Sequence, residues 1–212
     1  MEINPADITI REMYKLITGT IVPRAIGWVS TVNAQGQPNL APFSYFTAVC
    51  AKPPTILFCP GVRGRDVSLK DTLKNIHANG DFVVNIVTEA LAEAMNITAT
   101  ELPAEVNEFE LAGLTAVPSN IVAPPRLAES PVNYECKVAE IVDIGDGGKG
   151  SGSVVIGEVM HLHVADEVLQ PNFHIDIQAL RPIGRLAGPN YAYIRETFEI
   201  KRRPSELPPA EG

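Results

Sequence analysis

The stretch NLAPFSYFTAVCAKPPTILFCPG, residues 39–61, has the composition of two β-strands joined by a double proline. Asn39, Pro42 and Ser44 interrupt its first apolar run, and a proline cannot donate to a sheet ladder. Such a strand leaves backbone donors and acceptors unpaired beside apolar walls, which suits a flat heterocycle with polar edges. The simpler alternative is an edge strand with a bulge, where proline is tolerated.

Similar strand-like segments continue on both sides of this stretch. They are rich in β-branched and aromatic residues and end at glycine, proline or asparagine turns, and we expect strands over 21–32, 39–50, 55–59, 81–87, 132–144 and 153–164. The glycine-rich segment between the last two is a hairpin connection. Short helices are expected over 89–97 and 104–111. This order predicts a mainly β fold, a closed antiparallel barrel or sandwich with helical insertions.

One helix carries a chemical signal. In SLKDTLKNI, Leu73 and Ile76 form an apolar stripe, Asp71 is the expected N-cap, and Lys70 and Thr72 flank it. The free amides of a first helical turn, one ammonium and one hydroxyl suit a phosphate group. An ordinary capped surface helix is the alternative.

Asn85 adds a further hint, because a carboxamide inside an apolar strand must find hydrogen-bond partners. Those partners belong either to a ligand or to the protein core. Together, the irregular strand over 39–50, the start of the helix at 70–72 and Asn85 predict a pocket for an aromatic ring system that carries a phosphate.

Composition sets the outer limits. The chain has 212 residues and a formal net charge of -8, which argues against a general affinity for nucleic acid or anionic membranes. We expect one domain over residues 1–204, a polar tail over 205–212, and a cytoplasmic location, since no signal peptide or long apolar run is evident. Three scattered cysteines indicate buried free thiols.

Two other motifs do not predict a site. The glycines at 145, 147 and 150 have dinucleotide-fingerprint spacing, but a strand follows them where that motif requires a helix. His161 and His163 share one face of a strand, yet no third ligand stands at a recognisable spacing, so no metal is expected.

Beyond these arguments, the chain resembles a known family. The segments that carry the resemblance are IVPRAIGWVSTVNAQGQPNLAPFSYFTAVCAKPPTILFCPG, KDTLKNI, DFVVNIV, FELAGLT, ESPVNYEC and RPIGRLAGPNY, in this order over about residues 11–203. They are similar to the flavin reductase-like, FMN-binding split-barrel family, most of all to its flavoredoxin branch. The resemblance implies a Greek-key split barrel, a homodimer, and FMN bound near the subunit interface.

The resemblance also implies the site. The segment 39–46 would run beside the flavin ring, Lys70 to Thr72 would hold the phosphate, and Arg24 and Arg65 are looser candidates for the phosphate side. Arg185, Gly188 and Tyr191 would close the site, from the partner subunit. The expected cofactor-binding residues are Trp28, Ser30, Asn39, Ala41, Pro42, Phe43, Ser44, Phe46, Cys59, Pro60, Lys70, Asp71, Thr72, Asn85, Arg185 and Tyr191. Two residues depart from the family pattern: Ala25 replaces a proline, and Ala187 replaces a glycine.

Three functions follow from this resemblance. The favoured hypothesis is a reductase that passes hydride from reduced nicotinamide, NAD(P)H, to the flavin, with the chemistry carried by the cofactor and no catalytic side chain. The second is a flavoredoxin-like electron carrier that takes electrons from a protein. The third is a protein that binds flavin, or another ligand of tetrapyrrole size, without turnover.

Overall fold

Seven antiparallel strands form the main sheet of this computed structural model, which describes residues 1–204. The expected tail over 205–212 lies outside the described residues. The strand order is β2-β1-β5-β8-β9-β4-β3. The bounds are β1 Gly27–Val32, β2 Pro38–Phe43, β3 Phe46–Ala51, β4 Pro54–Phe58, β5 Asp81–Ile86, β8 Val132–Ile144 and β9 Gly152–Val164. The predictions of a mainly β fold and of antiparallel pairing are confirmed.

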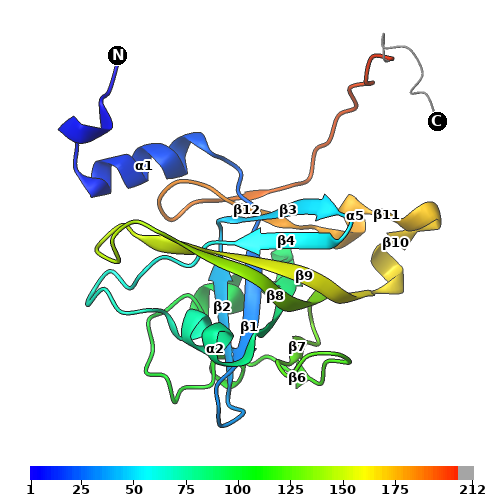
Figure 1. Ribbon diagram of the computed structural model, residues 1–212. Coiled ribbons are helices and arrows are strands. Elements are labelled where there is room, and N and C mark those ends of the chain that lie inside the picture. The colour runs from blue at the N-terminus through cyan, green and yellow to red at the C-terminus, as the bar shows by residue number, and fades with distance from the viewer. Residues whose placement is uncertain (205–212) are drawn as a thin grey trace, which may run out of the picture.

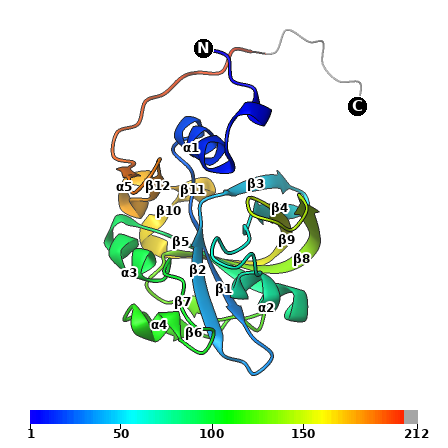
Figure 2. The same cartoon turned by 90° about the vertical axis from the view of Figure 1, so that its left-hand side faces the viewer.

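The two edge strands of this sheet are consecutive in the chain. Only Ser44 and Tyr45 lie between the end of β2 and the start of β3, although five strands separate them in the sheet. The sheet must therefore be rolled so that its edges meet. Figures 1 and 2 show this curvature, with β3, β4, β8 and β9 bending round to one side of β1 and β2. The result is a barrel with an open seam between β2 and β3.

Aromatic rings fill the barrel. The ring centroid of Phe58 lies 5.0 Å from that of Phe43 and 5.3 Å from that of Phe82. A Cβ at position 157 would overlap the Phe82 ring, so this strand position requires glycine. Helix α2, Asp71–Asn79, closes the barrel with Leu73 and Ile76, which are buried in the same cluster.

A second core lies on the outer face of β1. Trp28 and Leu40 pack there with Met95 and Phe109, from helices α3 (Ala92–Ile97) and α4 (Glu108–Leu111). All six residues of β1 are buried, because the strand has a core on each face.

The remaining elements are short. They are α1 Ile10–Thr20, β6 Ala116–Val117, β7 Arg126–Leu127, β10 Leu169–Gln170, β11 His174–Ile175, α5 Ile177–Leu180, β12 Ile183–Arg185, β13 Tyr191–Tyr193, and 3-10 turns at Pro5–Asp7, Glu89–Leu91, Asp166–Val168 and Pro171–Phe173. Helix α1 projects from the body in Figure 1 and was not predicted. Among residues 1–204, no helix is long and apolar enough to cross a membrane.

Several sequence predictions need correction. The strand expected over 39–50 is two strands, since the chain turns at 44–45 from one sheet edge to the other. The strand expected over 21–32 begins only at Gly27, and the helix expected over 104–111 begins only at Glu108. Cys136 is buried as expected, but Cys50 is exposed because β3 is an edge strand with little cover.

Candidate functional site

The N-terminus of α2 lacks a side-chain cap. The N-cap residue is Lys70, not Asp71 as predicted, and Asp71 is the first residue inside the helix. The amides of Leu73 and Lys74 bond to the Lys70 carbonyl at 3.0 and 3.1 Å, whereas first-turn amides such as those of Asp71 and Thr72 have no intrahelical acceptor. This helix end therefore presents donors and the positive end of its dipole.

These donors line a small hollow of about 80 Å³. The open edge of β2 and the start of α2 form one side, and the segment after α3 faces them. The lining residues are Asn39, Ala41, Pro42, Arg63, Lys70, Asp71, Thr72, Thr98, Ala99, Thr100, Glu101, Leu102 and Glu108. Because β2 is an edge strand, Pro42 removes no hydrogen bond from the sheet, and its presence in this run is explained.

Lys70 is half-buried at the edge of the hollow. Its Nζ lies 5.3 Å from the ring centroid of Phe43, within cation–π range. Burial lowers the pKa of Lys70, and the charge of Glu101 opposes this shift only in part. Among the described residues no carboxylate forms an ion pair with it. An anionic ligand would supply the missing counter-charge.

The other polar groups of the hollow form hydrogen bonds and ion pairs with one another. The amide Nδ2 of Asn39 donates to Thr72 Oγ1 at 3.0 Å, which leaves the hydroxyl proton of Thr72 available. Arg63 forms a close ion pair with Asp71, whose second oxygen accepts from Lys74 Nζ at 3.1 Å. These contacts fix the orientation of α2 and of the arginine.

One carboxylate is built into the same wall. Glu108 is only 9% exposed, and its Oε2 accepts a hydrogen bond from the backbone amide of Leu40 at 3.2 Å. Burial raises the pKa of Glu108, and the charge of Asp71 adds to this shift. The glutamate therefore serves as a hydrogen-bonding partner at the open edge of β2.

The structure brings six of the sixteen predicted site residues to the hollow. They come from two segments that are far apart in the sequence but adjacent in space: Asn39, Ala41, Pro42, Lys70, Asp71 and Thr72. Ser44 lies just beyond them at the seam, where Arg24 Nε donates to its Oγ at 3.4 Å. Their use by a cofactor remains a prediction.

Three predicted residues lie in the interior instead. Trp28, Ser30 and Asn85 have no exposed surface. Trp28 Nε1 donates to Thr98 Oγ1 at 2.9 Å, and Ser30 Oγ donates to the carbonyl of Pro125 at 2.5 Å. Their polar atoms are occupied by protein groups, so the geometry gives these three side chains a structural role rather than a place in the wall.

The hydrogen-bond partners of Asn85 belong to the protein core, which is one of the two alternatives that the sequence left open. Its Nδ2 donates to the Trp28 carbonyl at 2.9 Å, and its Oδ1 accepts from the Leu127 amide and from Asn133 Nδ2, each at 2.9 Å. Four segments are thereby tied together at one buried carboxamide.

The two looser arginine candidates are also placed elsewhere. Arg24 is 8% exposed and donates to the carbonyls of Thr18, Ile21 and Leu186 at 2.7 to 3.0 Å, so its guanidinium joins α1 to the C-terminal region. Arg65 is exposed and outside the hollow's lining, whereas Arg63 is part of it.

The remaining predicted residues surround the site at a distance. Phe43 and Phe46 point into the barrel core, and Cys59 and Pro60 follow β4 at the seam, where the Cys59 amide bonds to the Tyr45 carbonyl at 2.8 Å. On β12 and β13, the Arg185 guanidinium carbon lies 4.4 Å from the Tyr191 ring centroid, and Arg185 donates to the Gly188 carbonyl. None of these six residues lines the hollow.

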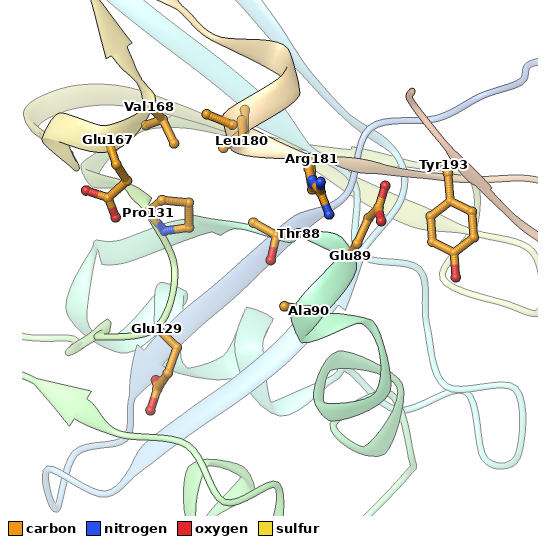
Figure 3. A pocket seen from close by; sticks show the side chains of 11 residues that line it. Thr88, Glu89, Ala90, Glu129, Pro131, Glu167, Val168, Leu180, Arg181 and Tyr193 are labelled. Carbon is orange, nitrogen blue, oxygen red and sulfur yellow. The ribbon is translucent and has the colours of Figure 1, made fainter. Parts of the chain in front are cut away.

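A larger hollow, of about 510 Å³, lies in a different part of the molecule. Val168 and Leu180 form its apolar floor, and Glu129, Glu167 and Arg181 stand around it (Figure 3). It contains Glu89 as well, already paired with Arg195. Its lining thus has three carboxylates and one guanidinium.

Sequence reasoning missed Arg63, Glu108 and the segment 98–102. Arg63 and Arg65 occur in the same loop, and only the fold distinguishes them. Glu108 lies in the helix expected over 104–111, and 98–102 is a connection without regular structure; we find no sequence feature that would have placed either at β2.

Comparisons with known proteins agree with the rolled sheet. Residues 19–184 match the family model described as flavin reductase like domain. An uncharacterized protein of Halalkalibacterium halodurans is 43% identical over 203 residues, 95% of this chain and 96% of that protein. Nitrilotriacetate monooxygenase component B from Bacillus cereus is 37% identical, with a TM-score of 0.89, covering 94% of this chain and 98% of that one.

The fold itself is shared more widely. A protein from Shewanella frigidimarina with a split barrel domain has a TM-score of 0.81 at 22% identity, covering 96% of this chain and 100% of that one. The present sheet, open between β2 and β3, is such a split barrel. With the match of its residues 19–184, this chain belongs to the flavin reductase-like family.

Proposed function

We propose that this protein is an FMN-binding oxidoreductase that accepts electrons from a reduced nicotinamide nucleotide. The observation that carries the proposal is the half-buried ammonium of Lys70, which has no ion pair among residues 1–204 and lies at the uncapped start of α2, beside the open edge of β2. One similar structure is a component of a monooxygenase, which supports an oxidoreductase role.

The phosphate group of FMN fits the donors in the small hollow. Lys70 would supply the charge, the first-turn amides of α2 the helix dipole, and the Thr72 hydroxyl a further donor that Asn39 orients. Arg63, held by Asp71, would add a second cation at the same place. The volume of the hollow, about 80 Å³, is on the scale of one such group rather than of a whole nucleotide.

The ring of the flavin would then extend along the open seam. Backbone groups of 41–44 lie on an edge strand and are available to a polar ring edge. Arg24 fixes the Ser44 hydroxyl there, and Cys59 lies on the opposite side of the seam. Bound flavin would supply the redox chemistry by accepting a hydride from the nicotinamide; the protein binds, orients and shields it.

A second subunit would complete the site. Helix α1 exposes Ile10, Tyr14 and Ile17 and buries only Thr18, so residues 1–204 leave much of its apolar face uncovered. The segment 185–191 does not reach the hollow of its own chain. We therefore propose a homodimer in which α1 is covered by the partner and 185–191 contributes across the interface. Sedimentation equilibrium tests this: a dimer mass supports the arrangement, and a monomer mass contradicts it.

The redox proposal is tested by anaerobic spectroscopy. Protein loaded with FMN is mixed with NADH or NADPH in separate runs, and the visible flavin absorbance is followed. Rapid bleaching by either donor supports the reductase. If neither donor bleaches flavin that dithionite reduces in the same protein, the electron carrier replaces the reductase. Loss of bleaching in Lys70→Gln, with bleaching kept in Lys74→Gln, would link the activity to the small hollow.

A further inference from the structure

The wall that would receive the phosphate contains more acidic than basic groups. Arg63 and Lys70 face three carboxylates, those of Asp71, Glu101 and Glu108. A phosphate monoester carries close to two negative charges at neutral pH. It would therefore enter a wall without surplus positive charge, which is unusual for a site that holds an anion tightly.

The three carboxylates are not equivalent. Asp71 is neutralised by Arg63 and Lys74. Glu101 is exposed, so its side chain is free to turn toward water. Glu108 is buried and held in place by the Leu40 amide at 3.2 Å, and among residues 1–204 no cation forms an ion pair with it. Arg63 acts on the charge of Glu108, but this guanidinium is already paired with Asp71, and solvent has little access to the Glu108 carboxylate.

We propose that Glu108 is a specificity-determining residue that weakens the grip on the flavin phosphate and so keeps FMN exchangeable. This rests on the proposed function, since it assumes that the small hollow receives that phosphate. An exchangeable flavin is one that can leave after reduction, as a substrate does, rather than remain as a prosthetic group. The same carboxylate reduces the advantage of FMN over riboflavin, which lacks the phosphate.

The charges around Glu108 give the expected pH dependence. The groups that face it are Asp71 and Arg63 from the α2 region, Glu101 from the opposite segment, and Lys70. Burial already raises the pKa of Glu108, and an arriving phosphate acts in the same direction. Protonation of Glu108 as the pH falls therefore removes the repulsion and favours FMN.

The substitution Glu108→Gln is a close test. A glutamine keeps an oxygen that accepts from the Leu40 amide and removes only the charge. We expect FMN to bind about five- to tenfold more tightly, as for removal of one like charge at a partly buried site, with riboflavin affinity unchanged. The matched control is Glu110→Gln, an exposed residue of the same helix, for which both affinities should stay at the wild-type values.

Fluorescence titration of both flavins into wild type and variants separates the outcomes. Tighter FMN binding with unchanged riboflavin binding supports the role of Glu108. Equal or weaker FMN binding by Glu108→Gln overturns it and leaves the proposed function intact. A wild-type protein that binds neither flavin overturns both.

A second comparison uses the pH dependence. The ratio of FMN to riboflavin affinity is measured between pH 8 and pH 5 in the wild type and in Glu108→Gln. In the variant this ratio falls as the phosphate gains its proton, whose pKa is about 6. In the wild type, protonation of Glu108 opposes this fall, so we expect a shallower pH profile; identical profiles overturn the proposal.

Discussion

The small hollow at α2 and the polar cluster around Asn85 contain the same kinds of side chain but use them differently. Around Asn85, both polar atoms of the carboxamide bond to protein groups at 2.9 Å. In the small hollow, Lys70 has no counter-ion among the described residues, and the first turn of α2 has no cap. The sequence presents both as polar residues in apolar surroundings.

This difference separates structural polar groups from ligand-binding ones. Every polar atom of the Asn85 carboxamide has a protein partner, whereas the Lys70 ammonium and the first-turn amides of α2 remain available to a ligand. Volume does not make this distinction. The larger hollow offers about 510 Å³, but its lining has three carboxylates, one guanidinium and no lysine.

The largest expected effect is on stability, at the polar cluster around Asn85. Asn85→Ala leaves the Leu127 amide, the Trp28 carbonyl and the Asn133 amide without their partner, so we expect a loss of about 3 kcal/mol in the free energy of unfolding. Thermal unfolding should show a Tm about 10 °C lower. Asn96→Ala, at an exposed position of α3, should leave the Tm unchanged. A stable Asn85→Ala that fails to bind FMN would reverse the assignment.

Next in size is the loss of the unpaired ammonium. Lys70→Gln should weaken FMN binding about tenfold to a hundredfold, the range of a charge-assisted hydrogen bond, while the Tm changes little. Lys74→Gln is the matched control, because Lys74 is on the same helix but already paired with Asp71. Calorimetric titration with FMN measures both. Equal affinities in the two variants would show that Lys70 does not contact the phosphate.

A smaller effect should distinguish the two arginines of one loop. Arg63→Gln removes the second cation of the hollow and frees the Asp71 carboxylate, so we expect FMN affinity to fall about five- to tenfold. Arg65→Gln, outside the lining, should bind FMN as the wild type does. If Arg65→Gln weakened FMN binding and Arg63→Gln did not, Arg65 would be the phosphate ligand, as the sequence suggested.

No effect is expected at the larger hollow. Arg181→Gln removes its guanidinium, and both FMN and riboflavin should bind with wild-type affinity in the same titration. A clear loss of FMN affinity would mean that the larger hollow, not the one at α2, takes the cofactor.

Much of the fold could be predicted from the sequence. Strand periodicity indicated the antiparallel strands, and the glycine-rich hairpin between β8 and β9 was located correctly. The break at 44–45 could not be predicted, because its cause is the closure of the barrel, which no local signal reports. The same holds for α1, whose apolar face is largely exposed in the described part of the chain.

The site was predictable where backbone geometry creates it. Lys70 and Thr72 follow from the start of a helix, and Asn39 and Pro42 from an irregular strand, and the fold brings them together. For Trp28, Ser30 and Asn85, burial depends on which face of the strand is covered, and β1 and β5 are covered on both. Tertiary packing, rather than residue type, decides whether a polar residue of a strand lines the small hollow or is buried in the core.

The most direct test of the account is a crystal structure of the protein with FMN. We expect the phosphate within hydrogen-bond distance of Lys70 Nζ and the Thr72 hydroxyl, with the ring along the seam between β2 and β3. A flavin bound at the larger hollow, or a phosphate that contacts neither Lys70 nor Thr72, would contradict it.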